Sequence, residues 1–144
     1  MSLVVSETVA PGIARIAINR PDKRNAVSPE ARNDLIEAVT EALRDNATRA
    51  IVIGSTAGHF CAGGDIDSMI DLDVASGRTR MKDNHRMVRV LAEAEKPIVA
   101  GVEGFAVGAG AGIALLCDSI VLAESGALGF PFFRIGLTPD YGIL

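Results

Sequence analysis

The chain has 144 residues, a length that fits one domain, and 49% of them are apolar, which is enough for a hydrophobic core. Aromatic residues make up only 4% and Trp is absent, so we expect an aliphatic core. The net charge of -4 argues against wholesale attraction to nucleic acid or to an anionic membrane. No apolar run reaches the roughly 18 residues of a membrane helix, and Leu3 to Val5 is too short for a signal peptide. We therefore expect a cytoplasmic protein that does not bind nucleic acid or membranes.

The first third of the chain predicts a hairpin, a helix and a strand. Residues 3–19 predict a β-hairpin that turns at Pro11–Gly12, because apolar and polar residues alternate after the turn. Ser28–Pro29 is typical of a helix N-cap followed by a first-turn Pro, and apolar residues then recur at helical spacing to about Asp45. The apolar run 51–54 predicts a buried parallel strand.

The remaining chain alternates helix and strand patterns. Met81, His85, Val88 and Ala92 predict the apolar face of a helix that ends before Pro97, because the residue before a Pro disfavours helix. Such alternation gives a mainly parallel sheet, so the fold class is α/β. The expected elements are a short helix near 66–70, a surface loop at 71–79, that longer helix, a strand at 98–102, a helix at 107–116 and a strand at 119–123.

Two segments of small residues follow two of the predicted strands. Residues 60–66 follow the run 51–54, and residues 104–112 follow the run 98–102. Small residues let a ligand approach the backbone N–H groups. Two such loops could aim two donors at one carbonyl oxygen, which is the geometry of an oxyanion hole. The alternative is that the Gly and Ala residues only allow helices to pack closely on strands.

Gly108, Gly110 and Gly112 after a strand also suggest a dinucleotide-binding turn. In that fingerprint the third Gly lies five residues after the first. Here it lies four residues after the first, and position 113 is Ile. The spacing therefore argues against a dinucleotide site.

Six motifs occur in order along the chain: 18–21 (Ile-Asn-Arg-Pro) with 23–28 (Lys-Arg-Asn-Ala-Val-Ser), 60–66 (Phe-Cys-Ala-Gly-Gly-Asp-Ile), 96–100 (Lys-Pro-Ile-Val-Ala), 104–110 (Gly-Phe-Ala-Val-Gly-Ala-Gly), 117–118 (Cys-Asp) and 136–140 (Gly-Leu-Thr-Pro-Asp). Together they resemble the crotonase, or enoyl-CoA hydratase/isomerase, family. The resemblance implies a ββα superhelix, with residues 1–144 as a single acyl-CoA-binding core. Family members continue into further helices, so it also implies that a C-terminal helical region is missing from these residues. It further implies a homotrimer or hexamer.

The resemblance also implies which groups bind the substrate, an acyl-CoA thioester. The backbone N–H groups of Ala62 and Ala109 are the expected donors to the thioester oxygen as negative charge develops on it. CoA is then part of the substrate, so we expect no separate cofactor and no metal. Further contacts to the CoA thioester are expected from Lys23, Arg24, Ala26, Gly63, Gly64, Asp65, Ile66 and Gly108.

Some of these residues also have a simpler interpretation. Lys23 and Arg24 are expected to pair with the nucleotide phosphates, but a basic pair in a turn can also be only solvated. Asp65 is expected to cap a short helix, because an acid at that place accepts hydrogen bonds from the first-turn N–H groups. Cys61 and Cys117 have neither metal nor redox spacing and are expected to be buried free thiols.

The acid/base residues separate this chain from hydratases of the family. Those enzymes use two glutamates, and the corresponding residues here are Gly112 and Phe132. Water addition needs one group to activate water and another to deliver a proton, so isomerisation is favoured over hydration. Asp140 aligns with an aspartate of some dienoyl-CoA isomerases, ring-forming isomerases and dehalogenases, and is the expected proton-transfer group. The alternatives are that Asp140 only begins a helix after Pro139, and that the protein is a non-catalytic acyl-CoA-binding paralogue.

Overall fold

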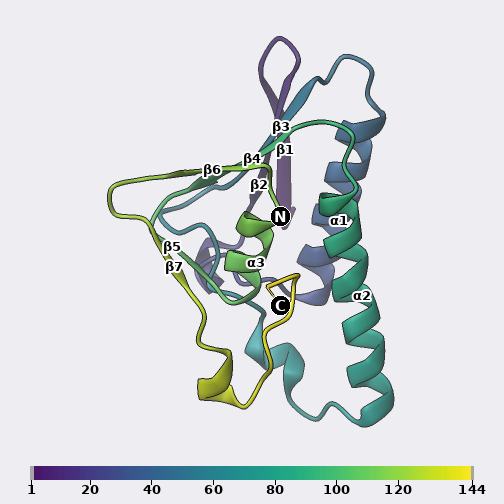
Figure 1. The fold of residues 1–144 in the computed structure, drawn as a ribbon, viewed down its shortest axis with the longest axis vertical. Coiled ribbons are helices and arrows are strands. Elements are labelled where there is room, and N and C mark those ends of the chain that lie inside the picture. Colours follow the sequence, from purple (N-terminus) through teal and green to yellow (C-terminus); the bar gives the residue numbers. More distant parts are fainter. Residues whose placement is uncertain (1, 144) are drawn as a thin grey trace.

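A twisted five-stranded sheet forms the centre of the computed structural model, which describes residues 2–143 (Figure 1). The strand order is β1-β2-β3-β4-β6. β1 and β2 form the predicted antiparallel hairpin, and every later neighbour in this sheet is parallel. The strands are β1 (Val4–Ala10), β2 (Ile13–Ile18), β3 (Ala50–Ser55), β4 (Ile98–Val102) and β6 (Ser119–Leu122).

A second, smaller sheet pairs β5 (Phe105–Val107) with β7 (Ala127–Gly129) in parallel. Neither strand was expected, because three residues are too few to show a period, and β5 lies where the helix 107–116 was predicted to begin. α3 (Ala109–Leu115) starts only after Gly108, whose φ of 53° and ψ of -115° break the chain direction. That backbone conformation suits Gly and sharply separates strand from helix.

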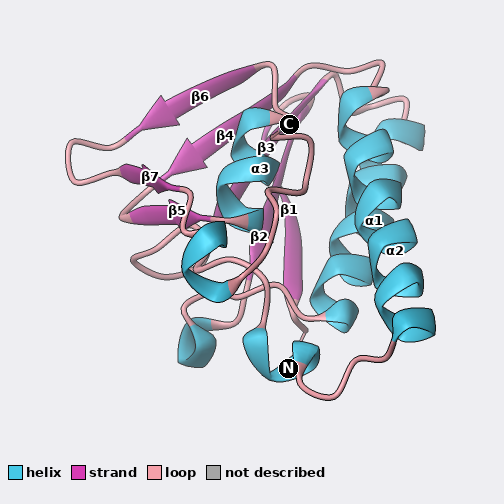
Figure 2. Cartoon of the chain, turned by 60° about the horizontal axis from the view of Figure 1, so that its bottom comes forward, coloured by secondary structure: helices cyan, strands magenta, loops and turns pink. Residues whose placement is uncertain are grey.

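Two long helices lie side by side along one side of the main sheet (Figure 2). α1 (Pro29–Arg44) begins as predicted, since the Ser28 side chain accepts a hydrogen bond from the N–H of Ala31 at 3.2 Å. α1 packs on β1 and β2, whereas α2 (Val74–Ala92) packs on α1. The smaller α3 contacts β4, β5 and β6.

The structure corrects two expectations for α2. Of the expected surface loop 71–79, only residues 71–73 lie outside a helix, because Asp73 and Ser76 form a capping box that starts α2 at Val74. His85 is exposed, and the buried face is formed by Asn84, Met87 and Leu91. The sequence pattern missed this face because its first member is a polar residue, whose burial depends on hydrogen bonds formed only in the folded protein.

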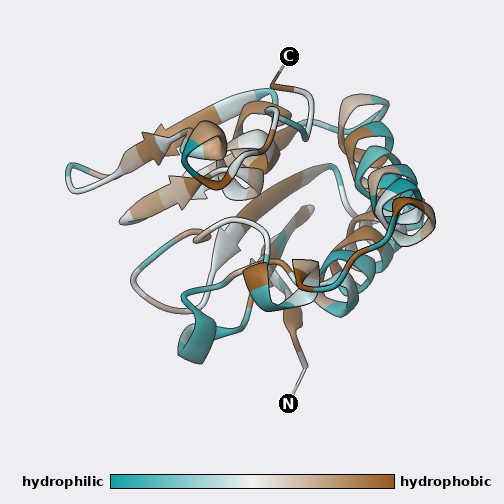
Figure 3. Ribbon diagram, turned by 90° about the horizontal axis from the view of Figure 1, so that it is seen from below, coloured by the Kyte–Doolittle hydropathy of each residue, from teal (hydrophilic) through white to brown (hydrophobic). Residues whose placement is uncertain are grey.

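The interior is aliphatic, as composition predicted, and the strands of the sheet carry much of it (Figure 3). Cys61 and Cys117 are buried free thiols, and burial raises the pKa of each to about 12. No helix among residues 2–143 is long and apolar enough to cross a membrane. The largest fully buried apolar side chains include Ile16, Ile18, Leu35, Ile51, Ile53, Phe60, Met87, Ile98 and Ile113.

Candidate active site

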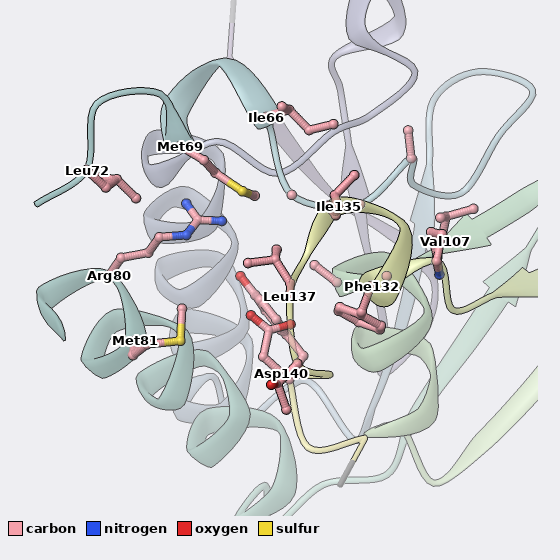
Figure 4. A pocket seen from close by; sticks show the side chains of 18 of the residues that line it. Ile66, Met69, Leu72, Arg80, Met81, Val107, Phe132, Ile135, Leu137 and Asp140 are labelled. Atoms are coloured by element: carbon pink, nitrogen blue, oxygen red, sulfur yellow. The ribbon is translucent and has the colours of Figure 1, made fainter. Parts of the chain in front are cut away.

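A cavity of about 570 Å³ lies between α2, the start of α3, the loop after β3 and the segment after β7 (Figure 4). Most of its wall is apolar, and Arg80 and Asp140 are its charged residues. Of the predicted site residues, Ala62, Gly63, Gly64, Ile66, Gly108, Ala109 and Asp140 line this cavity. The other four, Lys23, Arg24, Ala26 and Asp65, are not part of its wall.

The loop after β3 is held by backbone hydrogen bonds to the segment before α1. Val27 N–H donates to the Gly63 carbonyl at 2.8 Å, and Asp65 N–H donates to the Val27 carbonyl at 3.0 Å. Ala62 N–H donates to the carbonyl of Arg24 at 3.0 Å. The prediction that Ala62 supplies an oxyanion donor is therefore wrong for this structure, because its N–H is already engaged away from the cavity. Gly64, on the cavity wall, has an N–H with no acceptor among the described residues.

The start of α3 faces this loop at close range. Ala109 is the first residue of the helix, and its N–H also has no acceptor within residues 2–143. A Cβ atom added to Gly63 would lie 3.0 Å from the Val107 carbonyl oxygen and 4.0 Å from the Ala109 nitrogen. One added to Gly110 would lie 2.6 Å from Cβ of Cys61. Small residues thus let two separate segments, each with a free N–H group, lie close together on the same cavity. The same Gly and Ala residues therefore serve both close packing and access to the backbone donors.

Asp140 supplies the only carboxylate on the described cavity wall. Its Oδ2 atom accepts a hydrogen bond from Nδ2 of Asn84 at 3.1 Å. Partial burial raises the pKa of Asp140, and the hydrogen bond from Asn84 and the positive charge of Arg80 oppose that rise. Residues 141–142 form a turn, so Asp140 does not begin a helix within the described chain. Asn84 could not be predicted as a partner of Asp140, because a polar residue inside a helix is normally exposed.

Positions 112 and 132, where the resemblance to hydratases implies glutamates, are both closely packed in this structure. A side chain at position 112 would collide with Cβ of Tyr141 and would lie 2.9 Å from its carbonyl oxygen. Phe132 is buried, and its ring lies 3.8 Å from where a Cβ on Gly108 would be. No glutamate lines the cavity in the part of the chain that the structure describes.

The predicted CoA-binding turn lies beside the cavity loop. Nζ of Lys23 pairs with Asp67 at 2.9 Å, and this exposed hydrogen-bonded ion pair raises the pKa of Lys23. Arg20 ties the turn to the loop, since it donates to the Ala26 carbonyl at 2.6 Å and pairs with Asp65 at 3.0 Å. Asp65 also accepts a hydrogen bond from the N–H of Asp67, which confirms its predicted role as a helix cap. Phosphate binding by Lys23 and Arg24 stays a prediction.

Comparison with known proteins agrees with this arrangement. The family model described as enoyl-CoA hydratase/isomerase matches residues 8–144. The chain is 34% identical to crotonyl-CoA hydratase of Syntrophomonas wolfei, over 90% of this chain and 50% of that protein. It is 32% identical to 1,2-epoxyphenylacetyl-CoA isomerase of Escherichia coli K12, over 99% of this chain and 55% of that protein.

Solved structures show the same fold. The crystal structure of enoyl-CoA hydratase from Polaromonas sp. JS666 has a TM-score of 0.89 and 30% identity, covering 96% of this chain and 55% of that one. The crystal structure of enoyl-CoA hydratase from Thermoplasma volcanium GSS1 has a TM-score of 0.90 and 28% identity, covering 95% of this chain and 54% of that one. The chain spans about half the length of the curated relatives it matches. The expected crotonase-like fold is confirmed, and the chain belongs to the enoyl-CoA hydratase/isomerase family.

Proposed function

We propose that this chain contributes the acyl-CoA-binding and proton-transfer part of an isomerase that forms a thioester enolate. One observation carries the proposal: Gly64 and Ala109, whose N–H groups have no acceptor among the described residues, line the same cavity as Asp140, the only carboxylate on its described wall. This combination can activate a carbonyl and move a proton between carbons. Among the described residues, the cavity wall carries no second carboxylate to share the two proton transfers of water addition.

The first step assigned to these residues is polarisation of the thioester. Its carbonyl oxygen accepts hydrogen bonds from the N–H groups of Gly64 and Ala109, which strengthen as the enolate forms. Loss of one such donor typically costs about 3 to 4 kcal/mol of barrier. Nη2 of Arg80 lies 3.1 Å from where a Cβ on Gly64 would be, so a guanidinium adds positive potential beside the donor.

The second step is proton transfer by Asp140. Its carboxylate takes a proton from a carbon of the acyl group, and the electron pair of that C–H bond moves toward the thioester to form the enolate. The carboxylic acid formed at Asp140 exchanges its proton with solvent and then delivers a proton to another carbon as the double bond shifts, so atoms and charge balance without addition of water. Burial makes Asp140 a stronger base than an exposed Asp, which suits this role.

The relatives include both hydratases and an isomerase, so family membership alone does not choose the reaction. Gly112 and Phe132 favour isomerisation, because the two-glutamate mechanism has no residues to use here. The same replacements also fit a non-catalytic acyl-CoA-binding paralogue. Activity of the whole protein is therefore the quantity to measure.

The experiment is hydrogen exchange in deuterated water with the full-length protein and enoyl-CoA or dienoyl-CoA. We expect deuterium at the α or γ carbon and a shifted double bond, without a hydroxylated product. Asp140→Asn serves as the matched control and should abolish exchange while CoA-ester binding persists. Binding without exchange by the unmodified protein would favour the non-catalytic paralogue, and a 3-hydroxyacyl product would contradict the choice of isomerisation.

A further inference from the structure

A buried amide connects Asp140 to a buried arginine on another helix. Asn84 lies in the middle of α2 and is 0% exposed. Its Nδ2 atom donates to Oδ2 of Asp140 at 3.1 Å. Its Oδ1 atom accepts from Nη1 of Arg32 at 3.0 Å and from the hydroxyl of Tyr141 at 3.2 Å. Helices α1 and α2 and the segment after β7 therefore meet at one side chain.

The orientation of this amide is fixed by chemistry. A guanidinium carries only donors, so the amide group must present its oxygen to Arg32 and its NH₂ group to Asp140. Arg32 cannot easily turn away, because it is 3% exposed and its Nη2 atom pairs with Asp83 at 3.1 Å. Burying an arginine is costly unless it is paired, so its bonds to Asp83 and Asn84 keep the Arg32 side chain in place.

We propose that Asn84 is a positioning residue for Asp140. Its amide links the charge of Arg32 to one carboxylate oxygen of Asp140 and leaves the other oxygen for proton transfer. Asn84 holds Oδ2, whereas no side chain among the described residues donates to Oδ1. Asn84 is not part of the cavity wall, so it acts through Asp140 and not on the substrate. The catalytic meaning of this contact rests on the proposed function, but the contact itself does not.

The charges around Asp140 determine what loss of Asn84 does to its proton affinity. Arg80 and His85 of α2 lower the pKa of Asp140, and Arg32 of α1 lies beyond Asn84. Tyr141 is the neighbouring titratable group, and burial raises its pKa to about 12, so it stays neutral at pH 7. The hydrogen bond from Asn84 is the largest influence that opposes burial. Without it, the pKa of Asp140 should rise further, because the charged form loses its donor.

The test uses two variants of the full-length protein. Asn84→Leu removes the amide. Asn84→Asp keeps an oxygen for Arg32 but places a second carboxylate beside Asp140. Asp83→Asn is the matched control, since it alters the same network yet leaves Asn84 and Asp140 in place. The readouts are carbon-13 NMR titration of the Asp140 carboxyl, and kcat, KM and the pH profile of proton exchange.

We expect both Asn84 variants to raise the Asp140 pKa and to move the acid limb of the kcat profile to higher pH. At the wild-type optimum kcat should fall about 10- to 100-fold, the scale of a misplaced catalytic group, while KM changes less than threefold. Asp83→Asn should leave the limb in place or move it slightly to lower pH. Tyr141→Phe, which removes only one donor to the amide oxygen, gives a milder variant if Asn84→Leu fails to fold.

Two results would overturn the inference: an Asp140 pKa that is unchanged in a folded Asn84 variant, or a folded variant that loses stability but keeps the wild-type kcat and pH profile. A wild-type protein without exchange activity would instead refute the proposed function. The NMR titration would then still decide whether Asn84 governs the protonation of Asp140. The two failures are therefore distinguishable.

Discussion

Asp140 is held in a half-buried position at some cost to the folded state. Burial raises its pKa, so the native protein binds a proton there more tightly than the unfolded chain does. Protonation of Asp140 therefore favours folding, and the stability that it contributes is lost as pH rises through the raised pKa. At neutral pH the charged carboxylate therefore opposes folding, as expected for a residue placed for chemistry.

Asp140→Asn should consequently lower activity and raise stability. Turnover should fall by about 10² to 10⁴, the usual contribution of a general acid/base group, while CoA-ester affinity stays within a few fold. The melting temperature should rise at pH 7, and the gain should shrink as pH falls through the raised pKa. Calorimetric titration with an acyl-CoA and thermal melts at several pH values test both parts. Equal loss of binding and turnover would show that Asp140 is structural.

α3 contributes its first N–H group to the cavity, because the helix begins at Ala109 immediately after the left-handed Gly108. Ala109→Pro removes that N–H at a helix position where Pro is otherwise tolerated. Turnover should fall about 10²- to 10³-fold, as for loss of one oxyanion donor. Ala109→Ser keeps the N–H and serves as the control. Near-native activity of a folded Ala109→Pro protein would remove Ala109 from the proposed mechanism.

α2 carries Arg80 and Asn84 to the site, and its start depends on the capping box of Asp73 and Ser76. Asp73→Ala should cost about 1 kcal/mol of unfolding free energy, the typical loss for an N-cap. Because the cap lies next to the cavity wall, amide exchange should accelerate most in the first turns of α2. Urea unfolding with exchange mass spectrometry provides the measurement. Uniform acceleration over the whole chain would contradict a local effect.

The regular elements were predictable from local patterns, whereas the site was only partly so. The hairpin, α1 and β4 follow from alternation, an N-cap and a bounded apolar run. Ala62 was misassigned because motif spacing does not say which way a peptide N–H points; its bond to Arg24 exists only after two distant segments pair. Asn84 was missed because its burial depends on partners far away in the sequence.

At the scale of the molecule, apolar side chains gather on the segment after β7. Phe133 is 81% exposed, and Phe130, Ile135 and Leu137 are also exposed. An exposed apolar group of this kind marks a surface suited to contact with other protein. The homotrimer or hexamer implied by the family resemblance stays a prediction, as does a single core over residues 1–144.

The 144-residue chain prepared alone should therefore associate or melt without a sharp transition. Phe133→Ser should increase the monomer fraction in size-exclusion chromatography with light scattering. Val9→Ser is the control, because Val9 is also exposed but lies on the hairpin at the opposite end of the molecule (Figure 1). A monomeric wild-type chain with a cooperative melt would argue against this expectation.

Because Tyr141 packs against Gly112, more than one mutation is needed to change this site from the proposed isomerisation to hydration. Gly112→Glu would place a carboxylate side chain where Tyr141 already lies, so Tyr141, which donates a hydrogen bond to Asn84, must move. We expect Gly112→Glu to destabilise the fold by about 1 to 3 kcal/mol or more, and to show no hydration in a coupled assay. Evolution from one reaction to the other would then cross an intermediate that performs neither, unless the loop carrying Tyr141 changed first.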